Sequence, residues 1–510
     1  MSRLTRITIM LAAFFALDKV VAFIRQVIIA RQFGLSAELD SFNVANNVPD
    51  MLYALISGGA LAIAFIPVLS EVLTKKGRPD AWKLFSRIAN LGFLVTASFA
   101  VLVAIFADAL VGWELGVAPG FDTPQQELVI QLMRLNLIGT IIFSISGLVM
   151  AGLQANQHFF LPALAPIFYN IGQIFGALIL APEEGFSIGG FTLPSFGLGV
   201  HGLVYGVIIG AFMHLAIQIP GLLRFKFRWT PGLGLKNEDV KSVLRLMGPR
   251  LITMLFIQLI FVVRDNLASR LAPGSVTALT YGWMIQQVPE TLIGTAIGTA
   301  LLPTLSEHMA RQERERFHAT IERAIQVLIA ITIPVAAILS LSLRPFISTV
   351  FKFGVEGTGL MVLVTAGYLA GLTAHSIKEV AARSFYAQKN AVVPMITAGI
   401  NLALYVLVGT QLYRLLDAPG ISLTDSIVYT VEVVILVLLL NRHMISPVKI
   451  TSPILRALLA AGLSAGAIVL IIRYLSPVLH PLMIGTISLL AGVLISLPLI
   501  LKEIRLLIKL

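Results

Sequence analysis

The residues with the clearest chemical potential are charged side chains that interrupt a long apolar run near the start of the chain. Asp18, Lys19 and Arg25 all stand within the apolar run 7–31. A charged side chain at the centre of a bilayer costs roughly 2.5–3.5 kcal/mol on insertion scales, so those retained usually face a cavity or a partner. Asp18 and Lys19 can neutralise each other locally, whereas Arg25 has no opposite charge one turn away. Arg25 is therefore predicted to need a cavity, water or an anionic ligand.

A second group of charges lies in and beside the apolar run 246–271. It contains Arg250, Arg264 and Asp265, with Arg270 near the end of the run. The guanidinium fork of arginine binds phosphate oxygens in a bidentate way, so an arginine-lined cavity favours a phosphate-bearing substrate. Two interpretations stay open for Arg264 with Asp265, because an ion pair at a helix end explains the same residues. Further charges inside apolar runs are Lys378, Glu379, Arg383 and Glu432.

The elements that must position these charges are membrane-spanning helices. Of the 510 residues, 57% are hydrophobic and only 12% are charged, whereas soluble domains are about 45–50% apolar and about 25% charged. A spanning helix needs about 20 apolar residues. The apolar stretches predict about fourteen spans: 7–31, 42–70, 85–107, 128–152, 160–181, 198–222, 246–271, 276–304, 320–343, 357–386, 391–413, 424–441, 453–474 and 480–501.

The connecting segments give the expected orientation of these spans. Short cytoplasmic loops carry an excess of Lys and Arg, and every strongly basic loop falls on one side when fourteen spans are counted. The basic positions include Lys75, Lys76, Arg78, Lys83, Arg87, Arg224, Lys226, Arg228, Lys236, Lys241, Arg245, Arg311, Arg314 and Arg316. We therefore expect a multi-pass protein of the bacterial cytoplasmic (inner) membrane with both termini in the cytoplasm. The net charge of +11 is read as a topology signal, and no nucleic-acid partner is expected.

An internal repeat of about 235 residues indicates two related halves. Asn46-Asn47-Val48-Pro49 matches Gln286-Gln287-Val288-Pro289, and Ala155-Asn156-Gln157 with Pro162 matches Ala387-Gln388-Lys389 with Pro394. Such a period covers six spans, so the copies are parallel and related by an axis along the membrane normal. We predict an all-α polytopic membrane protein with lobes at 1–225 and 226–445 and a C-terminal helix pair at 446–510. Because spans one and seven correspond, their charges are expected to face each other across a cavity.

Small residues and prolines mark the expected points of bending. Pro49, Gly58 and Gly59 lie in the second span, and Pro289 lies in the eighth. Proline and glycine permit helix kinks in membrane proteins, and bending is needed for alternating access. These four positions are therefore predicted gating or hinge residues, although kinks also occur in static bundles.

Signals for other classes of function are weak. The chain has no cysteine, and its eight histidines show no metal-ligand spacing, so no metal site and no cofactor are expected. Gly197-Leu198-Gly199-Val200-His201-Gly202 fits a dinucleotide fingerprint, but no strand precedes it. Small residues for close helix packing explain that segment better. A transporter, not an enzyme, is expected.

Along almost its whole length the sequence resembles the MurJ/MviN family of lipid II flippases. The motifs that carry the resemblance are Ile29-Ala30-Arg31-Gln32-Phe33-Gly34 with Asp40, Gly59-Ala60-Leu61, Ala64-Phe65-Ile66-Pro67, Ala118-Pro119-Gly120-Phe121, Pro162, Ala165-Pro166, Asn170, Met247-Gly248-Pro249, Leu267-Ala268-Ser269, Gly274-Ser275, Leu302-Pro303-Thr304-Leu305-Ser306 and Phe385-Tyr386-Ala387 with Pro394. The resemblance implies two six-helix lobes plus two helices that form a lipid-tail groove. It also implies movement of lipid II, a lipid-linked peptidoglycan precursor that carries a diphosphate, from the inner to the outer leaflet.

The resemblance assigns substrate-binding roles residue by residue, with departures. Arg25 matches a cavity arginine of the family's first helix, and Lys19 replaces its neighbour. Asp40 belongs to the matched first-loop motif. Tyr53 and Met284 stand where the family pattern has arginines on the second and eighth helices. Arg250, Arg264 and Arg270 are candidates for the replacement charge.

Four alternatives to lipid II transport stay open at the level of sequence. The changed arginines favour, as runner-up, a carrier of another polyprenyl-diphosphate-linked glycan. A cation-coupled drug antiporter would need acidic cavity residues, a glycan-polymerising enzyme would need an outer catalytic carboxylate, and a non-transporting scaffold would tolerate loss of Arg25. The expected partners are lipid II or a related glycan lipid and the surrounding membrane lipids, with the protein acting as a monomer.

Overall fold

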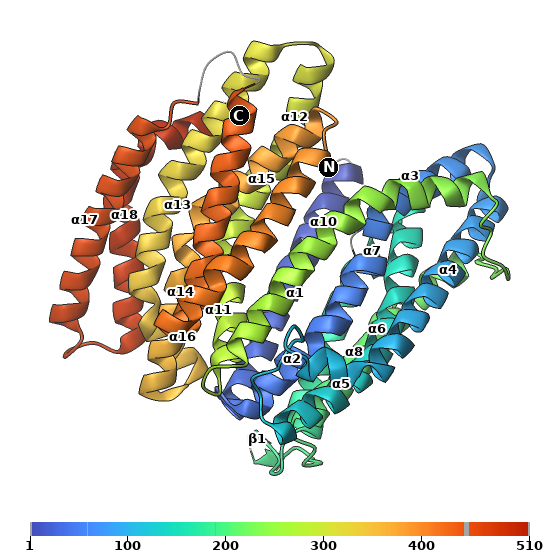
Figure 1. Cartoon of the computed structure of the whole chain (residues 1–510), viewed down its shortest axis with the longest axis horizontal. Coiled ribbons are helices and arrows are strands. Elements are labelled where there is room, and N and C mark those ends of the chain that lie inside the picture. The colour runs from blue at the N-terminus through green and yellow to red at the C-terminus, as the bar shows by residue number, and fades with distance from the viewer. Residues whose placement is uncertain (1–2, 59, 189, 443–447, 508–510) are drawn as a thin grey trace. The chain divides into compact units, whose positions relative to one another are not determined.

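The chain folds almost entirely into helices in the computed structural model (Figure 1). The structure describes residues 3–58, 60–188, 190–442 and 448–507, without the side chains at 3–9, 12, 57, 58, 60–64, 188, 191, 249, 250 and 507. Its internal contacts divide the chain into two compact units, unit 1 (Met1–Arg270) and unit 2 (Leu271–Leu510). The predicted lobe boundaries at residues 225 and 445 remain a prediction.

Unit 1 contains α-helices, two π-helical segments and one small hairpin. Its elements are α1 (Arg3–Phe33), α2 (Ala37–Tyr53), η1 (Ala54–Gly58), α3 (Ala60–Lys75), α4 (Arg78–Ile105), α5 (Ala107–Gly112), α6 (Thr123–Ala155), α7 (Phe160–Phe175), η2 (Gly176–Leu180), β1 (Ser187–Ile188), β2 (Phe191–Thr192), α8 (Val200–Ala216), α9 (Ile219–Arg224) and α10 (Glu238–Ala268). The strands pair antiparallel, with Ser187 opposite Thr192.

In the described residues of unit 2, all regular secondary structure is helical. Its elements are α11 (Ser275–Glu290), η3 (Thr291–Thr295), α12 (Ala296–Ala310), α13 (Arg314–Phe351), α14 (Gly354–Ala370), α15 (Leu372–Ala387), α16 (Val392–Asn441), α17 (Thr451–Leu475) and α18 (Pro481–Leu507). A sharp kink at Asp417, with φ 52° and ψ −140°, divides α16 into two arms. The Nδ2 atom of Asn401 on one arm donates to Glu432 Oε2 on the other at 2.5 Å. The two arms therefore lie side by side.

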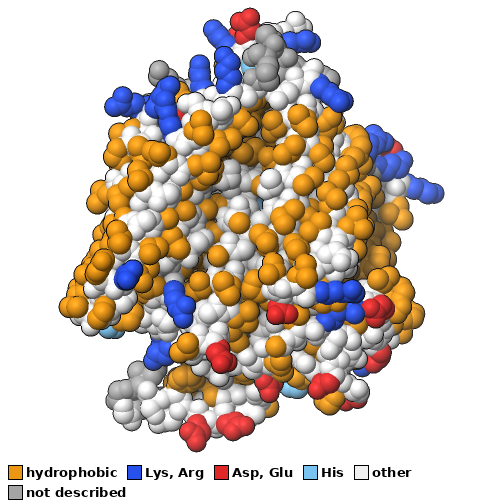
Figure 2. Space-filling view, turned by 60° about the vertical axis from the view of Figure 1, so that its left-hand side comes forward, with side chains coloured by type: hydrophobic (Ala, Val, Ile, Leu, Met, Phe, Trp, Pro, Cys, Tyr) orange, Lys and Arg blue, Asp and Glu red, His pale blue; other side chains and the backbone are white. Residues whose placement is uncertain are grey.

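Helical segments occur at all fourteen predicted spans, which confirms the all-α polytopic class. Eleven segments among the described residues are long and apolar enough by themselves to cross a membrane, and one of them, α16, holds two predicted spans. In Figure 2, hydrophobic side chains cover most of the visible flank of the molecule, and Lys and Arg gather mainly toward its upper and lower parts. Lipid, not water, is the solvent that makes such flanks stable.

Polar residues at the helix starts fix where the spans begin. The Ser36 hydroxyl accepts the Leu39 amide at 3.2 Å at the start of α2, and Asp122 accepts the Gln125 amide at 2.9 Å at the start of α6. Such caps satisfy backbone N–H groups that have no partner within the helix. The caps therefore separate consecutive spans at positions that the sequence encodes locally.

The internal repeat is visible as matching helix breaks within each unit. Pro49 lies in α2, which passes through η1 into α3, and Pro289 lies in α11, which passes through η3 into α12. Proline removes one backbone hydrogen bond and π-helical segments add a residue to a turn, and both bend helices. Each half of the sequence thus contains the same kinked span.

The second repeat motif forms the same turn twice. Gln157 and Lys389 both adopt φ 59°, a left-handed conformation. In one turn His158 N donates to Leu153 O, and in the other Asn390 N donates to Phe385 O, both at 2.9 Å. These bonds join a residue just beyond a helix to a carbonyl five positions earlier, a common helix C-terminal closure. The period found in the sequence therefore has a structural counterpart at the level of single hydrogen bonds.

Helix packing within the units relies on close contacts and on a buried apolar core. Gly172 and Gly176 lie against Gly210 and Gly206, where an added Cβ on Gly172 would come within 2.4 Å of the Gly210 Cα. Such glycines let α7–η2 and α8 approach backbone to backbone, as small residues do in membranes. In unit 2, α17 and α18 lie side by side and pack on α13 (Figure 1).

The helix α10 packs within unit 1, against α3, α2 and α4. In the sequence repeat, α10 is the first span of the second copy. Its charged residues are therefore placed by contacts with the first half of the chain, which the repeat alone does not indicate.

Candidate functional site

The candidate site in unit 1 is a polar network between α1 and α7. Arg25 Nη1 donates to Asn170 Oδ1 at 2.8 Å, and Asn170 Nδ2 donates to Asp18 Oδ1 at 2.8 Å. Asn170 is 4% exposed. One asparagine therefore holds a cation by its acceptor and an anion by its donors, which is the full use that a buried amide can make of both ends.

The sequence places these side chains by helical periodicity. Asp18 and Arg25 are seven residues apart in α1, which puts both on one face of the helix. The Phe14 and Phe160 rings meet edge to face at 5.5 Å between centroids, one turn before Asp18 and at the start of α7. This ring contact holds α1 and α7 together near the polar network.

The Arg25 guanidinium keeps unused hydrogen-bonding capacity. Its Nη2 makes only a long 3.4 Å bond to Gln26 Oε1, and its Nε is buried without a hydrogen-bond partner among the described residues. A guanidinium carries five N–H donors. An anion that approaches Arg25 can therefore be bound without breaking the bond that holds Arg25 to Asn170.

The helix α2 adds to the site a carboxylate, Asp50, that was not predicted from the sequence. Asp50 is exposed, and it lies within electrostatic range of Arg25 and Tyr53. Tyr169 on α7 is close to the same three groups. The signal for Asp50 was present, since an acidic residue follows Pro49 within a predicted span, but no local partner indicated its role.

Three aromatic rings pack together beside these groups. The Phe143 ring lies 5.5 Å from the Tyr53 ring and 4.7 Å from the Tyr169 ring between centroids. Tyr53 is therefore packed beside the polar network. An aromatic hydroxyl here can donate a hydrogen bond to an anion but adds no charge.

The other predicted substrate-binding residues lie in different surroundings. Lys19 is exposed on α1, and Asp40 on α2 is 1% exposed. Arg264 is 8% exposed and its Nη2 lies 2.8 Å from Asp265 Oδ1, while Asn47 Nδ2 donates to Asp265 Oδ2 at 2.7 Å. Arg264 is thus joined to α2 through Asp265.

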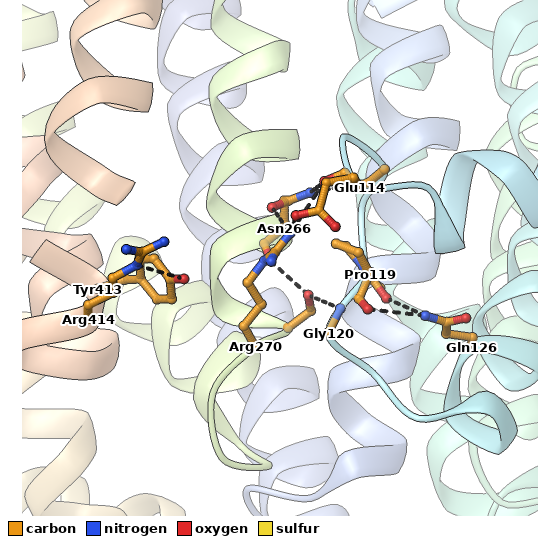
Figure 3. Close-up of polar contacts among 11 residues, drawn as sticks. Glu114, Pro119, Gly120, Gln126, Asn266, Arg270, Tyr413 and Arg414 are labelled. Carbon is orange, nitrogen blue, oxygen red and sulfur yellow. Dashed lines mark hydrogen bonds and ion pairs between the residues drawn. The ribbon is translucent and has the colours of Figure 1, made fainter. Parts of the chain in front are cut away.

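Arg270 lies at the end of α10 beside the segment that follows α5 (Figure 3). Its Nη2 is 2.7 Å from Glu114 Oε1, and Asn266 Nδ2 donates to the Glu114 carbonyl at 2.8 Å. The Gly120 amide donates to Ser269 Oγ at 3.1 Å. These bonds fasten the Ala118–Pro119–Gly120–Phe121 segment to α10. A role for Arg270 in substrate binding stays a prediction.

The remaining predicted positions are placed along the chain but not all are described. Pro49 is buried in α2, Gly58 ends η1, and Pro289 is buried in α11 just before η3. Gly59 and the side chain of Arg250 lie outside the described residues. The described residues contain no group of three or more His, Cys, Asp or Glu side chains that could hold a metal ion.

Together the fold and the polar network define a polytopic membrane transporter with a small charged site inside a helix bundle. A family model described as "Lipid II flippase MurJ" matches residues 29–491. The chain therefore belongs to the MurJ lipid II flippase family, membrane transporters of peptidoglycan biosynthesis. This finding confirms the resemblance drawn from the sequence motifs.

Curated relatives support the same family. The chain is 28% identical over 429 residues to the lipid II flippase MurJ of Burkholderia cenocepacia, covering 82% of this chain and 79% of the relative. It is 27% identical over 439 residues to a probable lipid II flippase MurJ of Bdellovibrio bacteriovorus, with 85% and 81% covered. Both alignments cover most of each protein, so the similarity concerns the whole bundle.

Solved structures show the fold. A structure titled "Lipid II flippase MurJ, inward closed conformation" matches with a TM-score of 0.78 at 22% identity, covering 98% of this chain and 100% of the other. A multidrug resistance MATE family transporter of the MOP superfamily, in an inward-facing conformation, matches with a TM-score of 0.66 at 16% identity, covering 83% and 93%. The same fold therefore occurs in a structure titled as a lipid II flippase and in one titled as a multidrug resistance transporter.

Proposed function

We propose that this protein moves lipid II from the inner to the outer leaflet of the bacterial cytoplasmic membrane by alternating access. Arg25 binds the diphosphate of the head group. The single observation that carries the proposal is the Arg25–Asn170–Asp18 network, in which the guanidinium is held at 2.8 Å by Asn170 yet keeps free N–H donors. Family membership supplies the class of substrate.

The chemistry of the network fits a diphosphate. A guanidinium binds phosphate oxygens with two parallel hydrogen bonds, and such charge-assisted bonds are about twice as strong as neutral ones. Asn170 keeps the guanidinium oriented, so less side-chain freedom is lost when the anion binds. Asp18 accepts a hydrogen bond from Asn170. It keeps this bond when Arg25 binds a ligand.

Asp50 gives the site a counter-charge in the absence of substrate. An unpaired arginine inside a membrane protein is costly, and a nearby carboxylate reduces that cost. The same carboxylate attracts Arg25 and repels a diphosphate. Binding of the diphosphate must therefore overcome both interactions. The site is therefore suited to bind a strongly anionic head group and to release it, instead of holding it permanently.

The test is native mass spectrometry of the purified full-length protein with lipid II. Wild type should bind lipid II, and Arg25→Ala should weaken binding by about tenfold or more, because a hydrogen bond to a charged group contributes about 1.5–3 kcal/mol. Arg25→Lys should bind with intermediate strength, since lysine keeps the charge but loses the fork. Arg134→Ala is the matched control, because Arg134 pairs with Asp108 elsewhere in unit 1.

Each outcome decides between hypotheses. Binding that falls in Arg25→Ala and persists in Arg134→Ala supports the site. Equal binding by wild type and Arg25→Ala overturns the role of Arg25. If the wild-type protein does not bind lipid II but binds another polyprenyl-diphosphate-linked glycan, and Arg25→Ala loses this binding, the substrate is that glycan. This second candidate rests on the expectation, drawn from the family resemblance, that Tyr53 and Met284 replace arginines.

A further inference from the structure

Unit 2 contains a buried ionisable network that the proposed lipid site does not use. His375 Nε2 lies 2.8 Å from Asp425 Oδ2, and Lys378 Nζ lies 3.0 Å from Glu432 Oε2. The four residues come from α15 and the second arm of α16. Their exposures are low, with 7% and 6% for the side chains of the first pair and 18% and 2% for those of the second.

The two pairs share one aromatic ring. The His375 and Tyr429 rings stack at 3.8 Å between centroids, and Lys378 Nζ lies 4.3 Å from the centroid of the same Tyr429 ring. Asp425, Tyr429 and Glu432 are four and three residues apart, which puts them on one face of their helix. The two pairs are therefore neighbours, and a change of charge on His375 is felt at Lys378 and Glu432.

A break in the span places His375 deep in the bundle. The predicted span is split at Gly371 into α14 and α15, where an added Cβ would meet Ser426 Oγ at 2.5 Å. Ser426 Oγ donates to the Gly367 carbonyl at 2.6 Å, which satisfies backbone near the break. His375 follows Gly371 by one turn, near the middle of a 34-residue apolar helix pair.

The charges of this region do not balance without a proton. From α15, Glu379 pairs with Arg383, and from α11, Glu290 lies within electrostatic range of Glu379, His375 and Arg383. Among the described residues of this region there are four carboxyl groups, at 290, 379, 425 and 432, and two permanently cationic side chains, Lys378 and Arg383. Uncompensated charge is costly in the interior of a membrane protein. Proton uptake reduces the imbalance.

The other helices packed on α15 do not supply the missing charge. Among the described residues, the side chains of α12 and α13 that hydrogen-bond to α15 are threonines, with Thr299 bonded to Arg383 and Thr332 bonded to Thr373. The charged residues of α12, α13 and α14 stand toward the ends of those helices, at 307–308, 314–323, 344 and 356. The balance therefore rests on His375 and the four carboxyl groups.

A buried amide on the neighbouring helix α11 has unused hydrogen-bonding capacity. Gln286 is 1% exposed, and neither its Oε1 nor its Nε2 has a hydrogen-bond partner among the described residues. It lies on α11 three residues after Trp283, whose ring meets His375 edge to face at 5.5 Å, and four before Glu290. An unpartnered buried amide is costly. It can bond to a group that gains or loses a proton.

We propose that His375 and Asp425 form a proton-binding site in unit 2 that is linked through Tyr429 to the Lys378–Glu432 pair. The ligand is a proton, which adds to the imidazole and gives an imidazolium–carboxylate pair. No other bond forms or breaks. The site belongs to unit 2 and is distinct from the Arg25 network of unit 1.

Trp283 provides a direct readout, because a protonated imidazole quenches an indole in contact with it. The full-length protein in lipid nanodiscs is titrated from about pH 5 to about pH 9, and the fluorescence of Trp283→Phe is subtracted at each pH. The difference signal should decrease as the pH falls. His375→Gln should abolish this pH-dependent component, whereas His214→Gln, which changes a buried histidine of unit 1, should retain it.

Two further variants keep the test decisive if His375→Gln fails to fold. Glu432→Gln removes a negative charge and should move the midpoint of the fluorescence change to lower pH by roughly one unit. Lys378→Met removes a positive charge and should move it to higher pH by a similar amount. A flat signal in wild type, a signal that survives His375→Gln, or equal midpoints in both charge variants overturns the proposal. A signal that responds to Na⁺ at constant pH and ionic strength but does not respond to pH overturns the proton as occupant and assigns a metal cation.

Discussion

Asn170 on α7 accepts a hydrogen bond from Arg25 on α1, at 2.8 Å between Arg25 Nη1 and Asn170 Oδ1. The same amide donates to Asp18 and to the Pro166 carbonyl. The guanidinium is therefore oriented by one side chain that is itself fixed at three points. The anion-binding role proposed for Arg25 depends on this relationship.

Asn170→Ala should weaken lipid II binding by about tenfold, because Arg25 loses its orienting acceptor and Asp18 loses its donor. The measurement is the lipid II dissociation constant by native mass spectrometry. Asn156→Ala is a suitable control, since the Asn156 side-chain amide donates to the nearby Gly152 carbonyl at the end of α6, away from the Arg25 network. Unchanged binding in Asn170→Ala would show that Arg25 orients itself without this contact.

Asp265→Ala should lower thermal stability strongly, because it leaves Arg264 buried without its carboxylate and removes the acceptor of Asn47. Breaking a buried pair by removing one partner costs about 3–5 kcal/mol. The comparison is Asp80→Ala, which removes an exposed pair with Lys83 and should cost less than about 1 kcal/mol. Melting temperatures in detergent measure both, and equal losses would contradict the structural role given to Asp265.

Gly120→Ala should also destabilise the protein, because its Cβ would come within 2.6 Å of the Arg270 backbone. The segment would have to move away from α10, which loses the bond from the Gly120 amide to Ser269 and strains the Arg270–Glu114 pair. Overpacking of this kind costs about 1–3 kcal/mol. Gly359→Ala, on a helix with nothing within 4 Å of the new Cβ, should leave the melting temperature unchanged or raise it.

The turn between α6 and α7 should make stability slightly dependent on pH. Burial, together with nearby Arg224, lowers the pKa of His158 below its ordinary value of 6.5. A histidine whose folded pKa is lowered contributes stability above the unfolded pKa and loses it as pH falls through the folded pKa. Between about pH 8 and about pH 5, wild type should lose about 1 °C more in melting temperature than His158→Gln. Parallel pH profiles would refute this.

Much of the fold could be predicted from the sequence because membrane burial acts on each helix separately. Every predicted span contains a helix, since an apolar run of sufficient length has no other stable backbone state in lipid. The repeat was also readable, because the kink after Pro49 and the kink after Pro289 depend on local backbone chemistry. The family followed from ordered motifs and is confirmed by the family model.

The candidate site was predictable only in part. Arg25 could be singled out because it has no opposite charge one turn away, but its partner Asn170 is 145 residues distant in sequence. Asp50 was missed for a related reason, since it comes within electrostatic range of Arg25 only when the helices have assembled. The predicted roles of Lys19, Asp40, Arg264 and Arg270 stay predictions.

What the sequence determined by itself is where the apolar helices lie along the chain, because each residue's preference for lipid or water is an intrinsic property of its side chain. What only the tertiary structure decided is which charges meet. The packing of α10 within unit 1 joins Asp265 to Asn47, and the folding back of α16 joins Glu432 to Asn401. These partners are distant in sequence or separated by a kink, so their pairing energy exists only after the helices have packed.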